Sequence, residues 1–423
     1  MTAASETITT PAPVETIETR ASWMVATAAL AVCAVSFGAP LIAVVALKPI
    51  AADFGSARSV PALTYSLAWV GAAVGGLAMG PISERIGVRW TVMFGAVMVA
   101  AGLVLTSRSG PTGLYIGHGL FIGLLGNAGL NAPLYVYVSR WFDRRRGTAL
   151  ALISSGQSVA GAVWPPLFER AIASFGWRHT MLGFAVVEVA LIVPVAALVF
   201  GAAPEAQQPI AGFADPRAGA PVLGLRPNVA LGCLCVAGFL CCVPMAMPQG
   251  HLVAFCSDVG IPPTQGAAML SVLLACAFFS RNMWGFIADR IGGLRTILCG
   301  SVCQVTALIG FLLTQNEAGL FAVSAFFGLG FAGIIPAYIL AIRQLFPSSE
   351  AAWRIPTLLL FSGSGMAAGG WLAGFIFDRV GFYAAAFAVG IAVNFLHLAV
   401  IGTLVLRQRY LRGAAVDAGM AAE

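Results

Sequence analysis

The chain has 423 residues, of which 59% are hydrophobic and 9% are charged, and its formal net charge is +6. A soluble protein of ordinary composition carries charge on roughly a quarter of its residues, so this composition excludes a soluble domain with a polar exterior. Most of the surface must face lipid instead. The positive net charge then indicates how loops are distributed across a membrane, and it does not indicate a nucleic-acid partner.

Twelve apolar runs follow an amino-terminal segment, residues 1–21, that has no apolar core and that we expect to be a disordered cytoplasmic tail. Each run is close to the length of about 20 residues that a helix needs to cross a bilayer. The first six runs occupy 22–50, 60–82, 90–107, 113–139, 148–174 and 178–200. The last six occupy 227–255, 264–288, 295–314, 318–343, 354–377 and 382–406.

A segment rich in Pro, Gly and Ala, residues 201–226, separates the two sets and is typical of a linker. The sequence therefore predicts an all-α membrane protein with one six-helix bundle over 22–200, a second over 227–407 and a cytoplasmic tail over 408–423. An even number of crossings places both termini on one side. That side receives sixteen of the 23 Lys and Arg residues, so the positive-inside rule makes it the cytoplasmic side of the inner (plasma) membrane. The opposite side receives Lys48, Arg58, Arg108, Arg170, Arg178 and Arg379.

One charged phrase occurs twice. The sequence GPISERIGVRW at 80–90 returns as GFIADRIGGLR at 285–295, in each case where one predicted helix ends and the next begins. The same spacing takes Gly176 onto Gly381. The two halves therefore look like parallel copies of one six-helix unit, an arrangement found in transporters.

The repeated phrase predicts a cytoplasmic latch that forms in one conformation and breaks in another. Gly80 and Gly285 would permit close approach of a neighbouring helix, while Glu84 and Asp289 place negative charge near the start of the following helix, where the helix dipole favours it. The alternative is a solvated turn with ordinary positive-inside charges. The predicted latch residues are Gly80, Glu84, Arg85, Gly87, Arg89, Gly285, Asp289, Arg290, Gly292 and Arg295.

Both copies of this phrase resemble the best-known motif of the major facilitator superfamily, and the resemblance extends over residues 22–407. SFGAPLIAVVALKPIAADFG, SRWFDRRRGTALALISSGQSVAG and FGWRHT are similar to segments of its monocarboxylate and oxalate/formate carriers. The resemblance implies twelve transmembrane helices in two pseudo-symmetric six-helix bundles. It also implies secondary transport of a small organic anion by alternating access, coupled to protons or working by exchange.

Arg281 is the basic residue that belongs to neither face of the membrane, because it lies inside the eighth apolar run, about two turns before its cytoplasmic end. A charge in hydrocarbon costs at least about 3 kcal/mol on insertion scales, so it normally faces a cavity or a partner. In the resembled carriers an Arg at this place binds the substrate carboxylate, and a guanidinium can do so through two parallel hydrogen bonds. The alternative is an Arg that snorkels to the interface or binds carbonyl groups.

Further substrate-binding candidates are polar residues at membrane depth. Asn127, Asn131 and Tyr135 recur every four residues and share one helix face, which predicts a cavity wall or, equally, hydrogen bonds between helices. The other candidates are Gln157, Asn282, Tyr65 and Tyr338.

Candidates for a proton or anion relay are His251, near the outer end of the seventh run, and Lys48, near the outer mouth. The alternative for Lys48 is an interfacial anchor. Glu188 would take part only if it faced the cavity, and the resemblance places its helix at the periphery. Ala277 and Leu41 stand where the animal monocarboxylate carriers have Asp and Lys. These departures weigh against proton symport of lactate-like substrates and leave anion exchange open.

The sequence contains no phosphate loop, no zinc-spaced Cys/His set and no Gly-x-Ser-x-Gly elbow, so we expect no enzyme activity, metal or cofactor. Its nine cysteines lie in or beside apolar runs and are typical of buried packing residues. We expect a monomer whose partners are a small organic anion, a proton or counter-anion, and the lipid bilayer. One alternative is an exporter of drugs or hydrophobic compounds, which would carry an acid in its cavity. Another is a non-transporting membrane sensor, which would carry a long soluble signalling tail.

Overall fold

The computed structural model describes residues 18–142, 145–201 and 221–420. In this part of the chain the regular elements are helices, apart from an isolated bridge between Val222 and Leu225. The helices of the first half are α1 (Arg20–Ser36), α2 (Gly38–Val45), α3 (Leu47–Asp53), α4 (Ser59–Ile86), α5 (Val88–Arg108), α6 (Pro111–Ile116), the π-helix η1 (Gly117–Asn127), α7 (Ala128–Ser139), α8 (Arg146–Ser154) and α9 (Gly156–Val199). Those of the second half are α10 (Pro227–Asp258), α11 (Pro263–Ile291), α12 (Gly293–Leu313), α13 (Glu317–Phe331), α14 (Ile334–Leu345), α15 (Ser348–Val380) and α16 (Tyr383–Met420).

The predicted all-α membrane architecture is confirmed. The described residues contain eleven segments long and apolar enough to cross a membrane. The fifth and sixth predicted runs fall together in one of them, Thr148–Val199, whose 52 residues would extend about 78 Å as a single helix. That length greatly exceeds a hydrocarbon core of about 30 Å. Gly176, with φ 77° and ψ 161°, interrupts the helix inside this segment, so α9 consists of two helices and has the length for two crossings.

Positive backbone φ angles occur at glycines that the internal repeat relates to one another. Gly87 and Gly292 have φ values of 89° and 85°, and Gly176 and Gly381 have 77° and 87°. Residues with a Cβ rarely adopt this conformation. The repeat in the sequence is therefore also a repeat of the backbone, which reverses at equivalent places in the two halves.

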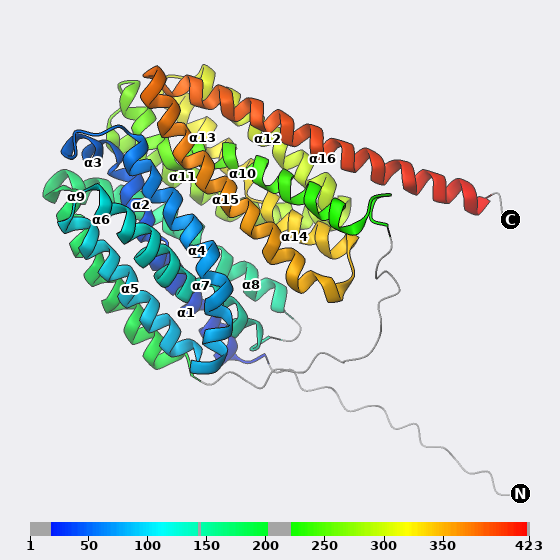
Figure 1. Ribbon diagram of the computed structural model, residues 1–423, viewed down its shortest axis with the longest axis horizontal. Coiled ribbons are helices and arrows are strands. Elements are labelled where there is room, and N and C mark those ends of the chain that lie inside the picture. The colour runs from blue at the N-terminus through cyan, green and yellow to red at the C-terminus, as the bar shows by residue number, and fades with distance from the viewer. Residues whose placement is uncertain (1–17, 143–144, 202–220, 421–423) are drawn as a thin grey trace, which may run out of the picture.

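Two buried apolar clusters form the interior. One gathers side chains of α1–α9, and the other gathers mainly those of α10–α16. The second cluster also includes Ala62 and Tyr65 of α4, so the halves share part of a core. Figure 1 shows α4 lying beside α15 along this shared region. The predicted bundle limits, 22–200 and 227–407, remain a prediction.

Glycine permits the closest helix contacts. A Cβ added at Gly75 of α4 would lie 2.2 Å from the Leu124 carbonyl oxygen of η1, and one at Gly369 of α15 would lie 2.0 Å from the Val243 carbonyl oxygen of α10. Small residues at such places let membrane helices pack backbone to backbone. These contacts hold each half together as a rigid unit.

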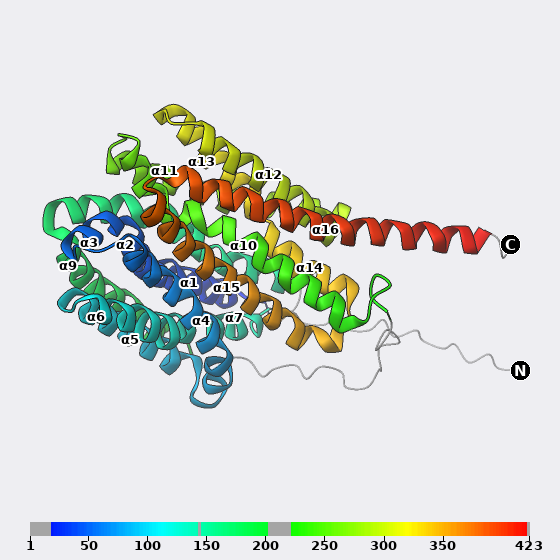
Figure 2. The ribbon, with the colours of Figure 1, turned by 45° about the horizontal axis from the view of Figure 1, so that its top comes forward.

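The chain ends differ from the expected tails where the structure describes them. Residues 1–17 lie outside the described part, and α1 begins at Arg20, so the last residues of the predicted tail 1–21 are helical. Most of the predicted linker, residues 202–220, also lies outside the described part. At the other end α16 continues to Met420, and Figures 1 and 2 show it projecting beyond the bundle.

Candidate functional site

Arg281 occupies the end of the apolar segment Pro263–Arg281 on α11, and its side chain is half-buried. Its Nη1 donates to the carbonyl oxygen of Ser154 at 2.8 Å and to Ser154 Oγ at 2.9 Å. Its Nε is buried without a hydrogen-bond partner in the described part of the chain. None of the ion pairs among the described residues includes Arg281, so its charge has no carboxylate partner there.

The partner of Arg281 is a helix end. α8 ends at Ser154, and α9 begins at Gly156. Carbonyl groups in the last turn of a helix lack intrahelical partners and lie at the negative end of the helix dipole, so they favour a cation. Because α8 belongs to the first half and α11 to the second, this contact joins the halves. Tyr135 of α7 also lies close enough to Arg281 for the two groups to interact electrostatically.

The predicted polar face of the fourth apolar run, 113–139, lies on η1 and α7 and divides into two parts in the structure. Asn127 is 3% exposed and accepts a hydrogen bond from Ser36 Oγ of α1 at 2.6 Å, which favours the helix-packing alternative for this residue. Asn131 Nδ2 donates to the Asn127 carbonyl oxygen at 2.9 Å, and its Oδ1 is buried without a partner among the described residues. Asn131 and Tyr135 therefore keep more capacity to bind a ligand than Asn127 does.

The remaining candidates are distributed along the contact between the halves. Gln157 is half-buried near the start of α9, and the side chain of Asn282 lies outside the described part of the structure. Tyr65 is 6% exposed and packs edge-on against Trp69, with ring centroids 6.3 Å apart. A Cβ added at Gly370 of α15 would lie 3.1 Å from the Tyr65 ring. Tyr65 therefore lies where the two halves meet.

Tyr338 belongs to a different environment. It is fully buried in α14, and its hydroxyl is 2.9 Å from His397 Nε2 of α16. His397 Nδ1 in turn is 2.7 Å from Ser301 Oγ of α12. This polar chain lies inside the second half, and the structure does not bring Tyr338 together with Arg281. We interpret Tyr338 as a core group.

The first copy of the predicted latch makes contacts within its own half. Glu84 pairs with Arg140 at the end of α7, with 3.0 Å between Oε1 and Nη2. Arg89 Nε donates to the carbonyl oxygen of Phe200, just after α9, at 2.9 Å. Gly87 makes the turn between α4 and α5. These contacts tie α4, α5, α7 and α9 together, and none of them crosses to the second half.

The second copy has no matching ion pair. Asp289 is exposed, and none of the ion pairs in the described part of the chain includes it. The Arg290 guanidinium carbon lies 4.0 Å from the centre of the Phe286 ring. Arg295 is exposed, as Arg85 is in the first copy, and Gly292 makes the turn to α12.

Close helix approach at Gly80 and Gly285 is expected from the sequence, and the structure does not show it. A Cβ added at either position would have no atom within 4 Å. Gly285 instead lines a cavity of about 190 Å³ between α11 and α14, together with Trp284 and Asp289. In this conformation the helix ends that carry the two phrases leave open space beside these glycines.

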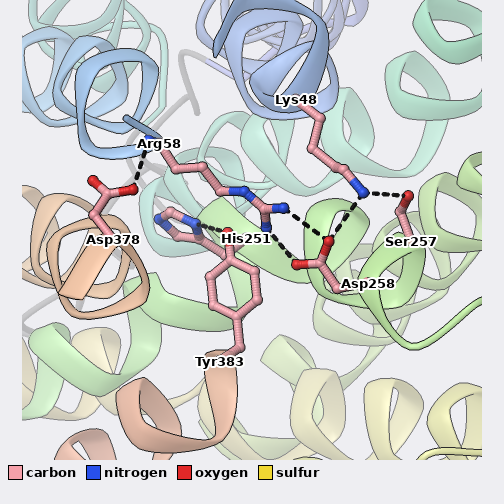
Figure 3. Close-up of polar contacts among 7 residues, drawn as sticks. All are labelled: Lys48, Arg58, His251, Ser257, Asp258, Asp378 and Tyr383. Carbon is pink, nitrogen blue, oxygen red and sulfur yellow. Dashed lines mark hydrogen bonds and ion pairs between the residues drawn. The ribbon is translucent and has the colours of Figure 1, made fainter. Parts of the chain in front are cut away.

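The ionic contacts between the halves in the described part of the chain lie at the start of α4, the end of that helix opposite to Gly80 (Figure 3). Asp258, the last residue of α10, accepts hydrogen bonds from both terminal nitrogens of Arg58, with 2.8 Å between Nη2 and Oδ1. It also accepts from Lys48 Nζ at 3.0 Å, and Lys48 donates to Ser257 Oγ at 2.8 Å. A bidentate guanidinium–carboxylate pair is geometrically specific. Only 16% of the Arg58 side chain is exposed, so solvent screens this pair less than a surface pair.

A second carboxylate from the same half contacts the start of α4. Asp378, near the end of α15, accepts hydrogen bonds from the backbone N–H groups of Arg58 and Ser59, each at 2.8 Å. These groups belong to the first turn of α4, which receives no cap from its own N-cap side chain and whose dipole favours an anion. We refer to Lys48, Arg58, Asp258 and Asp378 as the lock. Its cations come from the first half and its carboxylates from the second.

Aromatic rings fix the Arg58 guanidinium. Its central carbon lies 3.7 Å from the centre of the Phe377 ring and 5.5 Å from that of Tyr383. Burial lowers the pKa of Arg58, but the interactions with Asp258 and Tyr383 outweigh it and raise this pKa above its ordinary value. The guanidinium therefore stays charged throughout the physiological range.

His251 lies beneath the lock and is 1% exposed (Figure 3). Its Nε2 is 2.7 Å from the Gly370 carbonyl oxygen, which can only accept, so Nε2 carries a proton. Its Nδ1 is 2.9 Å from the Tyr383 hydroxyl, with which it forms a hydrogen bond. Both ring nitrogens are thus occupied, and His251 supports the aromatic floor of the lock.

Glu188 is completely buried in α9, and neither of its carboxylate oxygens has a partner among the described residues. Its burial excludes contact with a lipid headgroup in this conformation. It also means that Glu188 does not line an open cavity, where an exporter of hydrophobic cations would need an acid.

The sequence interpretation did not select Asp258 and Asp378 of the lock, or the neighbouring Tyr383, as candidates, although a signal was available. The 205-residue spacing between the charged phrases also takes Asp53 onto Asp258 and Arg178 onto Tyr383. Asp53 and Arg178 form an ion pair within the first half, with 2.8 Å between Oδ2 and Nη2. In the second half the equivalent of the arginine is Tyr383, which cannot neutralise Asp258. Asp258 therefore takes its cations, Lys48 and Arg58, from the other half.

Comparison with known proteins agrees with this architecture. The sequence profile of the Major Facilitator Superfamily matches residues 24–352. The MFS-type transporter pynF of Aspergillus niger is 27% identical over 319 residues, which cover 73% of this chain and 71% of that protein. Monocarboxylate transporter 13 of Bos taurus is 26% identical over 354 residues, which cover 80% of this chain and 79% of that protein.

Solved structures share the fold at low sequence identity. The nucleoside transporter NupG has a TM-score of 0.72 at 12% identity, covering 91% of this chain and 100% of that one. A bacterial homologue of the human lysosomal transporter Spinster, in an inward-facing and occupied conformation, has a TM-score of 0.68 at 15% identity, covering 94% and 97%. The helical repeat and the contacts between its halves define a class, the multi-pass membrane transporters. Within that class, the chain belongs to the Major Facilitator Superfamily.

Proposed function

We propose that this protein is a secondary active transporter of a small, monocarboxylate-like organic anion that works by alternating access. One observation carries the proposal. Arg281 lies between the halves and is bonded only to the neutral Ser154, while its Nε is buried and unpaired among the described residues. A buried cation is costly without a counter-charge, and a carboxylate is the ligand that a guanidinium fork binds best.

The relatives support the same substrate class. Monocarboxylate transporter 13 of Bos taurus matches across 80% of the chain, and its name states its cargo. In that interpretation Tyr135 and Asn131 lie on the first-half wall that faces Arg281, and an anion between them would contact both halves. We propose coupling either to protons or to a counter-anion, and an imposed pH gradient distinguishes the two.

The charge distribution supports an orientation with both termini in the cytoplasm, in the inner (plasma) membrane. The lock then lies at the outer end and is closed in this conformation, while the unpartnered Gly80 and Gly285 lie at the cytoplasmic end. An anion that binds Arg281 would compete with Ser154 and neutralise the buried charge. The loss of that contact would let the halves rock and expose the site to the other side.

Counterflow of labelled mono- and dicarboxylates into proteoliposomes tests the proposal. We expect the wild type to exchange at least one carboxylate, Arg281→Gln to abolish that exchange, and Arg281→Lys to keep part of it. Lysine retains the charge but lacks the bidentate fork, so its effect should appear mainly as a higher KM.

The matched control is Arg343→Gln, which removes an exposed arginine in the last turn of α14 and should leave counterflow unchanged. Carboxylate exchange that persists in Arg281→Gln would contradict the site. If every carboxylate failed and a cationic drug were carried, the exporter interpretation would replace the anion transporter.

A further inference from the structure

We propose that Lys48 and Arg58 form a second carboxylate-binding site at the outer end of the first half, which receives the substrate before Arg281 does. Asp258 occupies this site when the lock is closed. The inference rests on the proposed function, because it assigns an outer step to the same anion pathway. It identifies the ligand as a carboxylate through the group that the site already holds.

The geometry of the site is that of carboxylate recognition. Arg58 presents both terminal nitrogens to the two oxygens of Asp258, and Lys48 adds a third donor to Oδ1. The Lys48 donor comes from α3, and both Arg58 donors come from the residue just before α4. The carboxylate comes from α10. The carboxylate thus belongs to the element that must withdraw when the halves separate at this end.

The balance of charges shows that the site needs a replacement anion. Asp53 is paired with Arg178, so it does not compensate Lys48 and Arg58. When Asp258 moves away, two positive charges of the first half remain side by side without a counter-ion. Two like charges close together attract small anions from solution, and a carboxylate fits the donors that Asp258 leaves.

The same chemistry links substrate arrival to opening of the lock. A substrate carboxylate competes directly with Asp258 for Lys48 and Arg58, so its binding favours the conformation in which the halves are apart at this end. The anion would then be delivered towards Arg281, the next cation on the path between the halves.

Initial uptake by right-side-out vesicles tests this inference, with the labelled carboxylate that passes the counterflow assay as probe. The variant Lys48→Gln/Arg58→Gln should raise the KM for uptake by about tenfold or more, the factor expected for loss of a charge-assisted hydrogen bond. Asp258→Asn should lower that KM, because the internal competitor loses its charge. In inside-out vesicles the KM values of the two variants should differ from each other by no more than about twofold, since both changes open the lock and the cytoplasmic side does not use this site first.

The opposite signs of the two KM changes distinguish a substrate-binding site from a contact that only holds the halves together. If Lys48, Arg58 and Asp258 only held the halves together, removing either partner would favour the open conformation, and both changes would shift the KM in the same direction. That result would overturn the inference. Arg379→Gln is the matched control, because Arg379 is exposed at the same end of α15 and makes no contact with Asp258. An equal effect of Arg379→Gln would likewise overturn it.

A second measurement needs no transported substrate and keeps the inference distinct from the proposed function. Ala57, exposed beside Arg58, is replaced by Cys in a background with the exposed Cys299→Ser. Its modification by an anionic methanethiosulfonate should be faster than by a cationic one. Lys48→Gln/Arg58→Gln should lower the ratio of the two rates several-fold, and Arg379→Gln should not. If no carboxylate is carried, the proposed function fails, and an unchanged ratio would show that the second site fails as well.

Discussion

Two guanidinium groups join the halves, and they differ in what they bind. Arg58 holds the carboxylate of Asp258, whereas Arg281 holds only the carbonyl and hydroxyl of Ser154. A bidentate bond between two charged groups is stronger than a bond from a guanidinium to a neutral group, so the Arg58 contact is the stronger clamp. Arg281, by contrast, can exchange a neutral partner for an anion with a favourable change in free energy.

Asp258 pairs with cations of the opposite half because the repeat places Tyr383, and not an arginine, beside it. Tyr383→Arg would give Asp258 an arginine in its own half, as Arg178 does for Asp53. We expect the lock to weaken and the open population at this end to increase. Spin labels at exposed positions on either side of the lock, Ala57→Cys and Thr264→Cys, should report a shift to longer distances by double electron–electron resonance.

Tyr383→Phe is the control for this change. It removes the hydroxyl that contacts His251 without adding a charge, so the distance distribution should stay close to that of the wild type. If the Arg and Phe variants gave the same distribution, the shift would arise from lost packing, and the charge argument would be wrong.

At the scale of elements, each repeated phrase contains a glycine that makes the turn between two helices. Gly87 and Gly292 have φ values near 90° and extended ψ values of 145° and 161°, a region almost restricted to glycine. Ala at either position should lower the free energy of unfolding by about 1–3 kcal/mol. Thermal unfolding of the detergent-solubilised protein checks this, and both variants should unfold at lower temperature than the wild type.

The other glycines of the same phrases provide the control. Gly80 and Gly285 lie within helices, and a Cβ added at either would meet open space. Ala there should leave the unfolding temperature unchanged or raise it slightly, because Ala is the better helix former. Equal losses at all four positions would show that the turn conformation is not the reason for the glycines.

The sequence predicts the helices well because the bilayer imposes their length and composition. The twelve apolar runs correspond to the eleven observed segments once Thr148–Val199 is divided at Gly176. The sequence does not predict the π-helix η1, since its apolar residues follow no pattern that distinguishes it from an α-helix. The sequence also assigns Gly80 and Gly285 to helix contact, whereas the structure shows that Gly87 and Gly292 have the special backbone conformation.

At the scale of the molecule, the proposed alternating access would require α4 and α15 to separate. A Cβ at Gly363 of α15 would lie 3.6 Å from the Cβ of Ala73 of α4, a separation that suits a disulfide. We expect the double variant Ala73→Cys/Gly363→Cys to lose transport on oxidation and to regain it with a reductant.

Each single-cysteine variant should transport with and without oxidant, which separates cross-linking from damage to either helix. Full transport by the oxidised double variant, with the cross-link confirmed by mass spectrometry, would show that these helices need not part.

Sequence reasoning selected Arg281 and one residue of the lock, Lys48, and it missed the rest of the lock for a physical reason. Arg281 was predictable because a charge within an apolar run is exceptional at any position. Asp258 and Asp378 were not, because acidic residues in loops are common and only the packing of the halves shows what they bind. Tyr338 was selected for its polarity, yet its hydroxyl is used inside the second half.

The cap that Asp378 provides for α4 has one further consequence. The first backbone amides of α4 find their acceptor on a helix of the opposite half, so they are protected only while the two bodies touch. Hydrogen–deuterium exchange at Arg58 and Ser59 would then have a rate that follows the fraction of time for which the two halves are apart at this end of the molecule.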